Sequence, residues 1–408
     1  MNVYNSPVDK PNWEEINYRI NNINEEELKE DGFYGVTKET LLKISQVLEK
    51  NWAMVRKIVR EEGVMGVAHI RSIGDLPLAV EVQGNNIYVL GKKFINRGAL
   101  KKVTLAVRLN DLMPAAHATI RFEDLEGTIK TAKDVEHDTI KEIGMHYRLN
   151  NEPEFVHLHH ELVYTSKKKE GKPTVKKQSL MLEYCNGGDL FDAEELVDSN
   201  FKYIMDVVKH LFKGLKLLEE KNLIHRDIKP ENLLLMETEE ELVLKFGDLG
   251  FTNTIDDERK ILLKPGTVAA HSKEYQAPEV FYGNALKREG RSLSPQELDM
   301  MCSSKTDVWS AGITLFVLLK GEMPNFAGKI CYSFDPKVNE ENQKLIDAHI
   351  DLLRDGNWIE GLEGHEDEAE SLCALLYNML TIDQEERVSG TILWEQYQEL
   401  FEEETGSI

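Results

Sequence analysis

Apolar residues recur at steps of three and four positions along residues 37–63, TKETLLKISQVLEKNWAMVRKIVREEG. The members of this stripe are Leu41, Ile44, Leu48, Trp52, Val55 and Val59. This spacing predicts one amphipathic helix, with Thr37 as its N-cap and Gly63 as its end. Such a face usually packs on a core, so we interpret the stripe as packing rather than as a cofactor site. Residues 1 to about 76 are accordingly expected to be helical.

The pattern changes to that of β-strands between residues 78 and 183. The segments LAVEV and NIYVL adjoin QGNN, which predicts a hairpin. Three further segments, VTLAVRL, HATIRF and QSLMLEY, read as strands, and one helical segment, VEHDTIKEIGMHYRLN, lies among them.

Helical periodicity dominates after residue 187. The segment FKYIMDVVKHLFKGLKLLEEKN is amphipathic, whereas KTDVWSAGITLFVLLKG is almost wholly apolar, which predicts a buried central helix. We therefore expect an α+β chain in three parts. These are a helical extension over residues 1–77, a strand-rich smaller lobe over 78–184 and a helix-rich larger lobe over 185–408.

Composition narrows the classes of partner. The 408 residues carry a formal net charge of −23, and the resulting repulsion argues against nucleic acid and anionic membranes. Four cysteines lie far apart without C-x-x-C spacing, which fits reduced thiols better than disulfides or a zinc site. The first residues lack a signal-peptide pattern and the apolar run AGITLFVLLKG is too short to span a bilayer. We expect a soluble, cytoplasmic protein without membrane insertion.

Six lysines gather in SKKKEGKPTVKK, between two predicted strands. This Lys167–Lys177 loop is either a solvated hairpin tip or a docking patch for an acidic partner. The sequence leaves both interpretations open.

Charged and apolar residues are closely mixed in LIHRDIKPENLLL, residues 223–235, and KFGDLG follows at residues 245–250. Phosphoryl transfer from a nucleotide needs metal ligands, a positive charge at the phosphoryl group and a carboxylate that orients the acceptor. Asp227 is suited to accept the hydroxyl proton, and Lys229 to neutralise the moving phosphoryl group. Asn232 and Asp248 offer the oxygen ligands that magnesium prefers. This set predicts a site for ATP and Mg²⁺.

These segments resemble, in order, the motifs of the eukaryotic-type protein kinase family in its serine/threonine form. HRDIKPEN is similar to the catalytic loop, and DLG stands where the family has D-F-G. APE at 277–279 and DVWSAG at 307–312 are similar to later motifs, the second with an Asp that anchors the catalytic loop. Arg387 resembles the arginine that pairs with the Glu of A-P-E. The resemblance spans residues 78 to about 400 and implies a small antiparallel-sheet lobe with one helix, followed by a large helical lobe.

LEYCNGGDL, residues 182–190, resembles the hinge of the family. Leu182 takes the gatekeeper position, and Asp189 takes that of an acid that contacts ribose or substrate. The residues that the resemblance assigns to the nucleotide are Gly91, Lys92, Arg121, Leu182, Glu183, Cys185, Asp189 and Asp248.

The predicted small lobe departs from the family pattern at the loop that covers the phosphates. The family reads G-x-G-x-x-G-x-V, whereas LGKKFINRGALKKV keeps Gly91 and Gly98 at another spacing. Lys101 stands where the third glycine belongs. Backbone amides then approach phosphate less freely, and Lys92 or Lys93 is the expected compensation.

The strand lysine of the family's V-A-I-K is also replaced. ATIR puts Arg121 at its position, with Glu142 as the expected partner on the following helix, and Lys130 is the alternative cation. Arginine keeps the charge but has a larger, planar head, so the exchange is not conservative.

The sequence favours an active protein serine/threonine kinase over a pseudokinase scaffold or a kinase fold with nucleotidyl-transfer chemistry. Arg121 favours the scaffold, whereas the complete set of catalytic and metal-binding side chains favours the kinase. Asp189 and Glu231 predict a preference for Ser or Thr preceded by Arg or Lys. Five extra residues between Thr267 and Tyr275, relative to the family's G-T-x-x-Y-x-A-P-E, leave that preference open. An unusual small lobe joined to a regular large lobe is similar to kinases that bacteria and other intracellular pathogens deliver into host cells.

Overall fold

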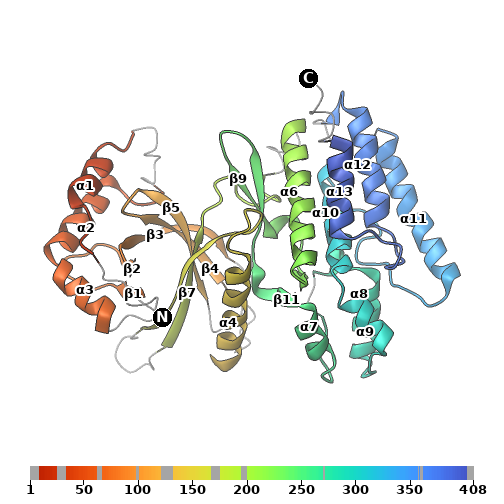
Figure 1. Ribbon diagram of the computed structural model, residues 1–408, viewed down its shortest axis with the longest axis horizontal. Helices are drawn as coiled ribbons and strands as arrows, with labels where there is room; N and C mark the ends of the chain where they lie inside the picture. Colours follow the sequence, from red (N-terminus) through yellow and green to blue (C-terminus); the bar gives the residue numbers. More distant parts are fainter. Residues whose placement is uncertain are drawn as a thin grey trace. The chain divides into compact units, whose positions relative to one another are not determined.

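The chain forms two compact units, shown in a computed structural model (Figure 1). Unit 1 consists of Met1–Ile143 and His157–Tyr184, and unit 2 of Gly144–Val156 and Cys185–Ile408. The structure describes residues 9–24, 34–61, 67–97, 101–120, 132–166, 175–193, 200–269, 272–356, 358 and 362–401.

Three helices open unit 1: α1 (Trp13–Asn21), α2 (Lys38–Lys50) and α3 (Trp52–Glu61). Thr37 caps α2 as predicted, because its hydroxyl accepts a hydrogen bond from the Thr40 N–H at 3.2 Å. The predicted single helix is wrong, since Asn51 ends α2 and its side-chain amide donates to the Val47 carbonyl at 2.7 Å. The stripe nevertheless faces one core, because α2 and α3 pack into the same apolar cluster. The predicted end at Gly63 lies outside the described residues.

Unit 1 also contains a seven-stranded antiparallel sheet in the order β1-β2-β3-β4-β5-β7-β6 (Figure 1). Its strands are β1 (Val67–Ile70), β2 (Val80–Gln83), β3 (Asn86–Arg97), β4 (Lys101–Arg108), β5 (Met113–Ile120), β6 (Leu158–Ser166) and β7 (Val175–Glu183). The predicted hairpin is confirmed, with Gln83 opposite Asn86 and Gly84 at a φ of 54° in the turn. Strand β1 corrects the prediction that residues 1 to about 76 are helical, because Val67–Ile70 pairs with β2 and gains a ladder of hydrogen bonds there.

Helix α4 (Ala132–Leu149) begins in unit 1 and ends in unit 2. In unit 1 its Ile143 packs with Ala118 and Ile120 of β5, Leu158 of β6 and Leu180 of β7. This apolar cluster fixes which face of the sheet α4 covers.

A carboxylate is buried among histidines on the strands of unit 1. The Glu81 side chain is fully buried, with His69 Nδ1 at 3.2 Å and His117 Nε2 at 3.3 Å from its Oε1, and His160 Nε2 at 3.0 Å from its Oε2. The Ser179 hydroxyl donates to Oε1 at 3.1 Å. Burial alone would raise the pKa of Glu81, but the contacts with the three histidines outweigh it and hold this pKa well below its ordinary value. The sequence did not predict this cluster, because its members come from five different strands.

Unit 2 is mainly helical. Its helices are α6 (Phe201–Glu220), α7 (Ile255–Leu262), α8 (Pro278–Arg288), α9 (Pro295–Met301), α10 (Lys305–Lys320), α11 (Pro336–Arg354), α12 (Glu366–Met379) and α13 (Gly390–Phe401). Two short antiparallel ladders join β8 (Leu223–Ile224) to β11 (Asn253–Thr254) and β9 (Leu233–Glu237) to β10 (Leu242–Phe246). Helix α10 is buried over almost its whole length, as predicted. Gly214 lets α6 approach β10 closely, since a Cβ there would lie 2.1 Å from the Phe246 ring.

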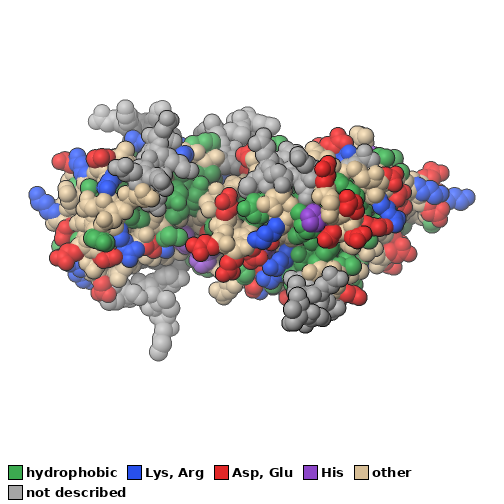
Figure 2. All heavy atoms as spheres, turned by 90° about the horizontal axis from the view of Figure 1, so that it is seen from above, with side chains coloured by type: hydrophobic (Ala, Val, Ile, Leu, Met, Phe, Trp, Pro, Cys, Tyr) green, Lys and Arg blue, Asp and Glu red, His purple; other side chains and the backbone are tan. Residues whose placement is uncertain are grey.

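Acidic and basic side chains are interspersed on the face shown in Figure 2. Asp and Glu side chains lie at many points of this face with Lys and Arg side chains among them, in line with the net charge of −23. In the Lys167–Lys177 loop, residues 167–174 lie outside the described residues, so the docking patch stays a prediction. Within the described part of the chain, no helix combines the length and apolarity that a membrane crossing requires.

Candidate active site

One buried acid of α10 fixes the backbone of residues 223–235, which are predicted to be catalytic and are called the catalytic segment below. Asp307 accepts hydrogen bonds from the N–H groups of His225 at 2.6 Å and Arg226 at 2.9 Å. Burial raises the pKa of Asp307, and the interactions with His225 and Arg226 act in the opposite direction. Arg226 needs this support because its φ of 69° lies in the left-handed region, which is strained for a residue other than glycine. The chain is thereby held in one conformation directly before Asp227.

The Asp227 carboxylate lies at the centre of a hydrogen-bonded cluster. Asn232 Nδ2 donates to Asp227 Oδ2 at 2.6 Å and to the Asp227 carbonyl at 2.8 Å. The Ser272 hydroxyl donates to Asp227 Oδ1 at 2.7 Å and accepts from Lys229 Nζ at 2.9 Å. Lys229 Nζ also lies 3.4 Å from Asp227 Oδ2. The structure therefore brings together three of the predicted catalytic residues, and adds a fourth that was not predicted.

Asp248 follows β10 on a strained turn beside this cluster. Its φ of 47° and ψ of 65° are left-handed, and its side chain is exposed. Gly247, just before it, donates its N–H to the Asn232 carbonyl at 2.8 Å and accepts from His225 Nε2 at 3.1 Å. These two bonds tie the backbone of Asp248 to the catalytic segment.

Asn232 and Asp248 are the residues that could hold a magnesium ion. The amide nitrogen of Asn232 is bound to Asp227, so its amide oxygen is the atom that can face a metal. Among the described residues, no three acidic, histidine or cysteine side chains form a metal cage of their own. One carboxylate and one amide oxygen fit Mg²⁺, which usually completes its shell with phosphate oxygens and water.

Arg226 connects the catalytic segment to α7. Its Nη1 lies 2.6 Å from Glu258 Oε2, and its Nε donates to the Phe251 carbonyl at 2.7 Å. Asn253 Nδ2 donates to the same Glu258 oxygen at 2.5 Å, and the Glu258 side chain is buried. A carboxylate from the chain itself therefore neutralises Arg226 and orders the residues after Asp248.

In unit 1, the predicted helix acid has a partner that the sequence analysis did not name. Glu142 Oε1 lies 2.5 Å from Lys101 Nζ, at the start of β4. Arg121 and Lys130, the two cations proposed for this role, lie outside the described residues. Their pairing with Glu142 therefore stays a prediction, whereas the pair of Glu142 with Lys101 is observed.

Gly91 lies inside strand β3 rather than in a turn. A Cβ at this position would come 2.8 Å from the Leu105 carbonyl oxygen, so the glycine permits the close approach of β3 and β4 at a break in their register. Lys92, next to it, is exposed. Gly98 lies outside the described residues.

The predicted hinge residues continue from the last strand of unit 1. On β7, Leu182 pairs with Ala116 and Glu183 with Ala115 of β5. Glu183 also exchanges backbone and side-chain hydrogen bonds with His157 in unit 1. Cys185 begins the second segment of unit 2 and its side chain is buried.

Asp189 and Glu231 interact electrostatically in unit 2. Burial raises the pKa of Asp189, and the negative charges of Asp192 and Glu231 raise it further. The Asp192 N–H donates to Asp189 Oδ1 at 2.9 Å. The two acids predicted to contact a basic peptide thus lie close enough to affect each other.

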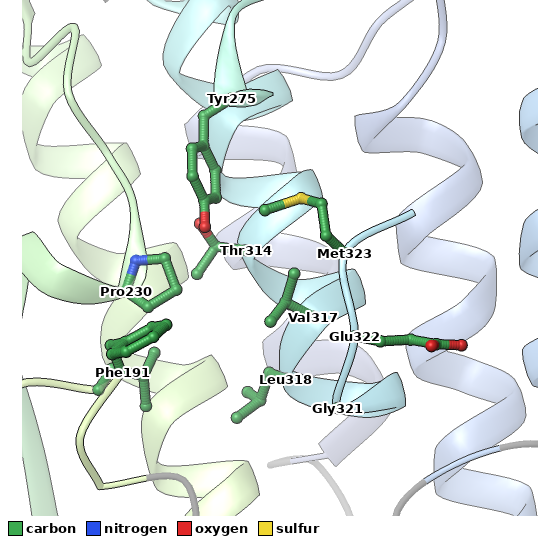
Figure 3. Close-up of a pocket in the computed structure, with 10 residues that line it drawn as sticks. Phe191, Pro230, Tyr275, Thr314, Val317, Leu318, Gly321, Glu322 and Met323 are labelled. Carbon is green, nitrogen blue, oxygen red and sulfur yellow. The ribbon is translucent and has the colours of Figure 1, made fainter. Parts of the chain in front are cut away.

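An apolar pocket of about 200 Å³ is lined in part by Leu190 and Pro230, which adjoin Asp189 and Glu231 in the sequence (Figure 3). Pro230 of the catalytic segment and Tyr275 contribute to its wall, together with Val317 of α10. Phe191 and Met323 also line it, although their side chains are 60% and 37% exposed. Exposed apolar side chains around a pocket are typical of a surface that receives another molecule.

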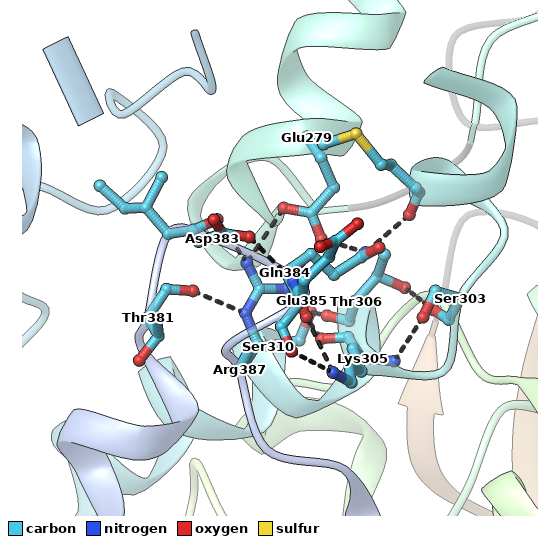
Figure 4. A network of polar contacts seen from close by, with 12 residues as sticks. Glu279, Ser303, Lys305, Thr306, Ser310, Thr381, Asp383, Gln384, Glu385 and Arg387 are labelled. Carbon is cyan, nitrogen blue, oxygen red and sulfur yellow. Dashed lines mark hydrogen bonds and ion pairs between the residues drawn. The ribbon is translucent and has the colours of Figure 1, made fainter. Parts of the chain in front are cut away.

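The predicted pair of Arg387 with the Glu of A-P-E is confirmed (Figure 4). Arg387 Nη1 lies 2.8 Å from Glu279 Oε1, and Nη2 donates to Oε2 at 3.1 Å. Gln384 Nε2 donates to the same Oε1 at 2.8 Å, and the guanidinium lies 5.1 Å from the centre of the Trp309 ring. This buried, two-pronged pair fastens the start of α8 to the segment before α13.

Ser272 is a member of the Asp227 cluster that the sequence analysis did not name. Thr267, the threonine of the G-T dipeptide, does not take this place, because its hydroxyl donates to the Ile261 and Lys264 carbonyls at 2.7 and 2.8 Å. Ser272 precedes Tyr275 by three residues, the interval between Thr and Tyr in G-T-x-x-Y-x-A-P-E. Counting back from A-P-E, rather than matching the G-T dipeptide, would have found it.

Comparison with known proteins agrees with this geometry. Residues 92–400 match the protein kinase domain family. The chain is 37% identical over 149 residues to the serine/threonine-protein kinase ATG1a of Arabidopsis thaliana, and the aligned region covers 36% of this chain and 20% of that protein. It is 30% identical over 225 residues to the serine/threonine-protein kinase atg1 of Dictyostelium discoideum, covering 53% and 26%. It is 32% identical over 232 residues to the serine/threonine-protein kinase chk-1 of Caenorhabditis elegans, covering 55% and 35%.

The chain thus spans between 20% and 35% of the length of these three relatives. The family match is broader, because it includes most of this chain and residues of both units. It also includes the hydrogen-bonded cluster around Asp227 and the buried pair of Arg387 and Glu279. The chain belongs to the protein kinase domain family.

Proposed function

We propose that this chain is a protein serine/threonine kinase, which transfers the γ-phosphoryl group of ATP to a hydroxyl group of another protein. The observation that carries the proposal is the cluster of Lys229, Asn232 and Ser272 around the Asp227 carboxylate. It contains a proton acceptor and a fixed cation within one hydrogen-bonded unit. The names of the relatives, all serine/threonine-protein kinases, support the choice of acceptor.

Each side chain has a distinct part in this reaction. The acceptor hydroxyl forms the new O–P bond, the bond from the γ-phosphorus to the β-phosphate oxygen breaks, and the hydroxyl proton passes to Asp227. Lys229 offsets negative charge on the transferred group. Asn232 and Asp248 are the residues that would hold Mg²⁺, which would supply positive charge to offset that of the phosphates.

The acidic and apolar surfaces near the cluster define the proposed acceptor. Asp189 and Glu231 carry negative charge that attracts Arg or Lys beside the phosphorylated Ser or Thr. The pocket between Phe191 and Met323 offers an apolar side chain of the same polypeptide a place to bind. We also propose a cytoplasmic location, because the four cysteines, all of them described, form no disulfide bond with one another.

A labelling experiment tests the proposed function. The chain is incubated with Mg²⁺, a mixed protein acceptor and ATP labelled either at the γ- or at the α-phosphate. We expect transfer of the γ-label only, and a loss of about 100-fold or more in Asp227→Asn, as for removal of a general base. The matched control is Asp256→Asn, an exposed acid at the start of α7, which should transfer label at the wild-type rate.

Binding and product identity separate the outcomes. Asp248→Ala should weaken the affinity for ATP in the presence of Mg²⁺, whereas Asp227→Asn should bind ATP normally. Absence of γ-label transfer by the wild-type chain would refute the kinase. Transfer of the α-label would show nucleotidyl transfer instead.

A further inference from the structure

The ion pair between Lys101 and Glu142 joins the first residue of β4 to helix α4 within unit 1. Lys101 Nζ lies 2.5 Å from Glu142 Oε1, and the Lys101 and Glu142 side chains are 19% and 5% exposed. A carboxylate this deeply buried needs a cation beside it. The pair also restricts the position of a long, flexible side chain.

The register of the sheet puts Lys101 on the face that α4 covers. Lys101 lies directly opposite Ile120 of β5, and opposite residues in an antiparallel pair point to the same face. Ile120 packs against Ile143 of α4 in the cluster described above. Leu182, the predicted gatekeeper, packs on that same cluster. Lys101 therefore shares its sheet face with a residue assigned to the nucleotide.

Arg121, the residue predicted at the family's phosphate-binding lysine position, follows strand β5 in the sequence, and β5 itself offers no such cation in its described length. Residues 113–120 read MPAAHATI and contain neither lysine nor arginine. The imidazole of His117 on this strand is directed to Glu81 instead. The family's third loop glycine, in turn, is replaced by Lys101. The same position in the sequence therefore lacks the glycine of the family's loop and carries the lysine that pairs with Glu142.

We infer that Lys101 is the cation that anchors the phosphates of ATP, so that this function has moved from the strand before α4 to the strand that follows the phosphate-covering loop. The inference rests on the proposed kinase activity. An ammonium group has three N–H donors, so a lysine that pairs with Glu142 can also donate to the α- and β-phosphate oxygens of a bound nucleotide. Glu142 is a positioning residue, which acts through Lys101.

Binding measurements with ATP and with adenosine isolate the phosphate contribution. Lys101→Ala should weaken the affinity for Mg²⁺-ATP at least tenfold and leave the affinity for adenosine, which lacks phosphates, unchanged. Glu142→Gln should act in the same direction but more weakly, because the lysine is retained. Lys102→Ala is the matched control, since Lys102 is the next residue on the strand and is exposed, and it should bind both ligands as the wild type does.

The decisive comparison is between the ATP affinities of Lys101→Ala and Arg121→Ala, because Arg121 is the other candidate cation. Wild-type ATP affinity in Lys101→Ala together with weakened ATP affinity in Arg121→Ala would overturn the inference. Equal loss of ATP and adenosine affinity in Lys101→Ala would also overturn it, because that result indicates a structural role. These outcomes are independent of the labelling test, since ATP binding is measured without an acceptor and a wild type that transfers no label can still be compared with Lys101→Ala.

Discussion

Removing the Ser272 hydroxyl tests whether the cluster around Asp227 must be complete for turnover. Ser272→Ala deletes one hydrogen bond to a carboxylate at 2.7 Å and one from the Lys229 ammonium at 2.9 Å. Hydrogen bonds to charged groups contribute about 1.5–3 kcal/mol. Asp227 keeps the bond from Asn232 at 2.6 Å, and Lys229 keeps its contact with Asp227, so neither charge is left unpaired.

Two charge-assisted bonds are lost, but because both charged groups keep another partner we expect the net loss to stay within the range for one such bond, about 2 kcal/mol of transition-state stabilisation. This corresponds to about a 30-fold decrease in kcat/KM for the protein acceptor, since about 1.4 kcal/mol is a factor of ten. Steady-state phosphorylation at varied acceptor and ATP concentrations measures it. Most of the decrease should lie in kcat, because Ser272 orients the two groups that act on the transferred phosphoryl group and the acceptor proton.

Two matched variants separate the role of this hydroxyl from general effects of the loop. Ser272→Thr retains a hydroxyl and should recover most of the activity. Thr267→Ala removes a hydroxyl that bonds only to nearby carbonyls of the α7 region, and kcat should stay within about twofold of wild type. A kcat/KM of Ser272→Ala close to the wild-type value would refute the reasoning, as would an equal loss in Thr267→Ala.

Three further predictions concern buried and exposed acids. Glu258→Gln leaves the buried charge of Arg226 unpaired and should lower the free energy of unfolding by about 3 kcal/mol, and an unchanged urea midpoint would contradict this. Because the pKa of Glu81 is lowered in the folded state, its contribution to stability is present above its unfolded pKa of about 4.3 and is lost as pH falls through its folded pKa. When unfolding is measured between about pH 7 and pH 3, the free energy of unfolding should therefore fall less steeply with acid in Glu81→Gln than in wild type, and parallel curves would exclude the carboxylate as a source of acid sensitivity. Peptides with Arg or Lys before the acceptor Ser or Thr should be phosphorylated faster than acidic peptides at low salt, and this preference should weaken at high salt and in the double variant of Asp189→Asn with Glu231→Gln. Equal or faster phosphorylation of acidic peptides in a peptide array at low salt would rule out the preference.

The strand and helix patterns show where reasoning from the sequence works. Alternation and turn composition identified the hairpin at Gly84, and the all-apolar pattern identified α10, because burial on one or all sides is written directly into a short segment. The stripe from Leu41 to Val59 identified a helical face but not the break at Asn51, since the two helices share one core and keep the spacing nearly in phase. Strand β1 was missed because four residues give little periodicity, and its structure depends on pairing with β2.

The sequence by itself determined the order of the motifs and the identity of the acids and amides of the catalytic segment, because these residues lie within a few positions of one another and act together through local backbone geometry. It also indicated the pair of Arg387 with Glu279 through the resemblance to the family. Only the tertiary structure decided which hydroxyl meets Asp227 and which cation meets Glu142. These partners are separated by 45 and 41 positions along the chain, and their contact depends on loop path, strand register and helix packing, which no local pattern encodes.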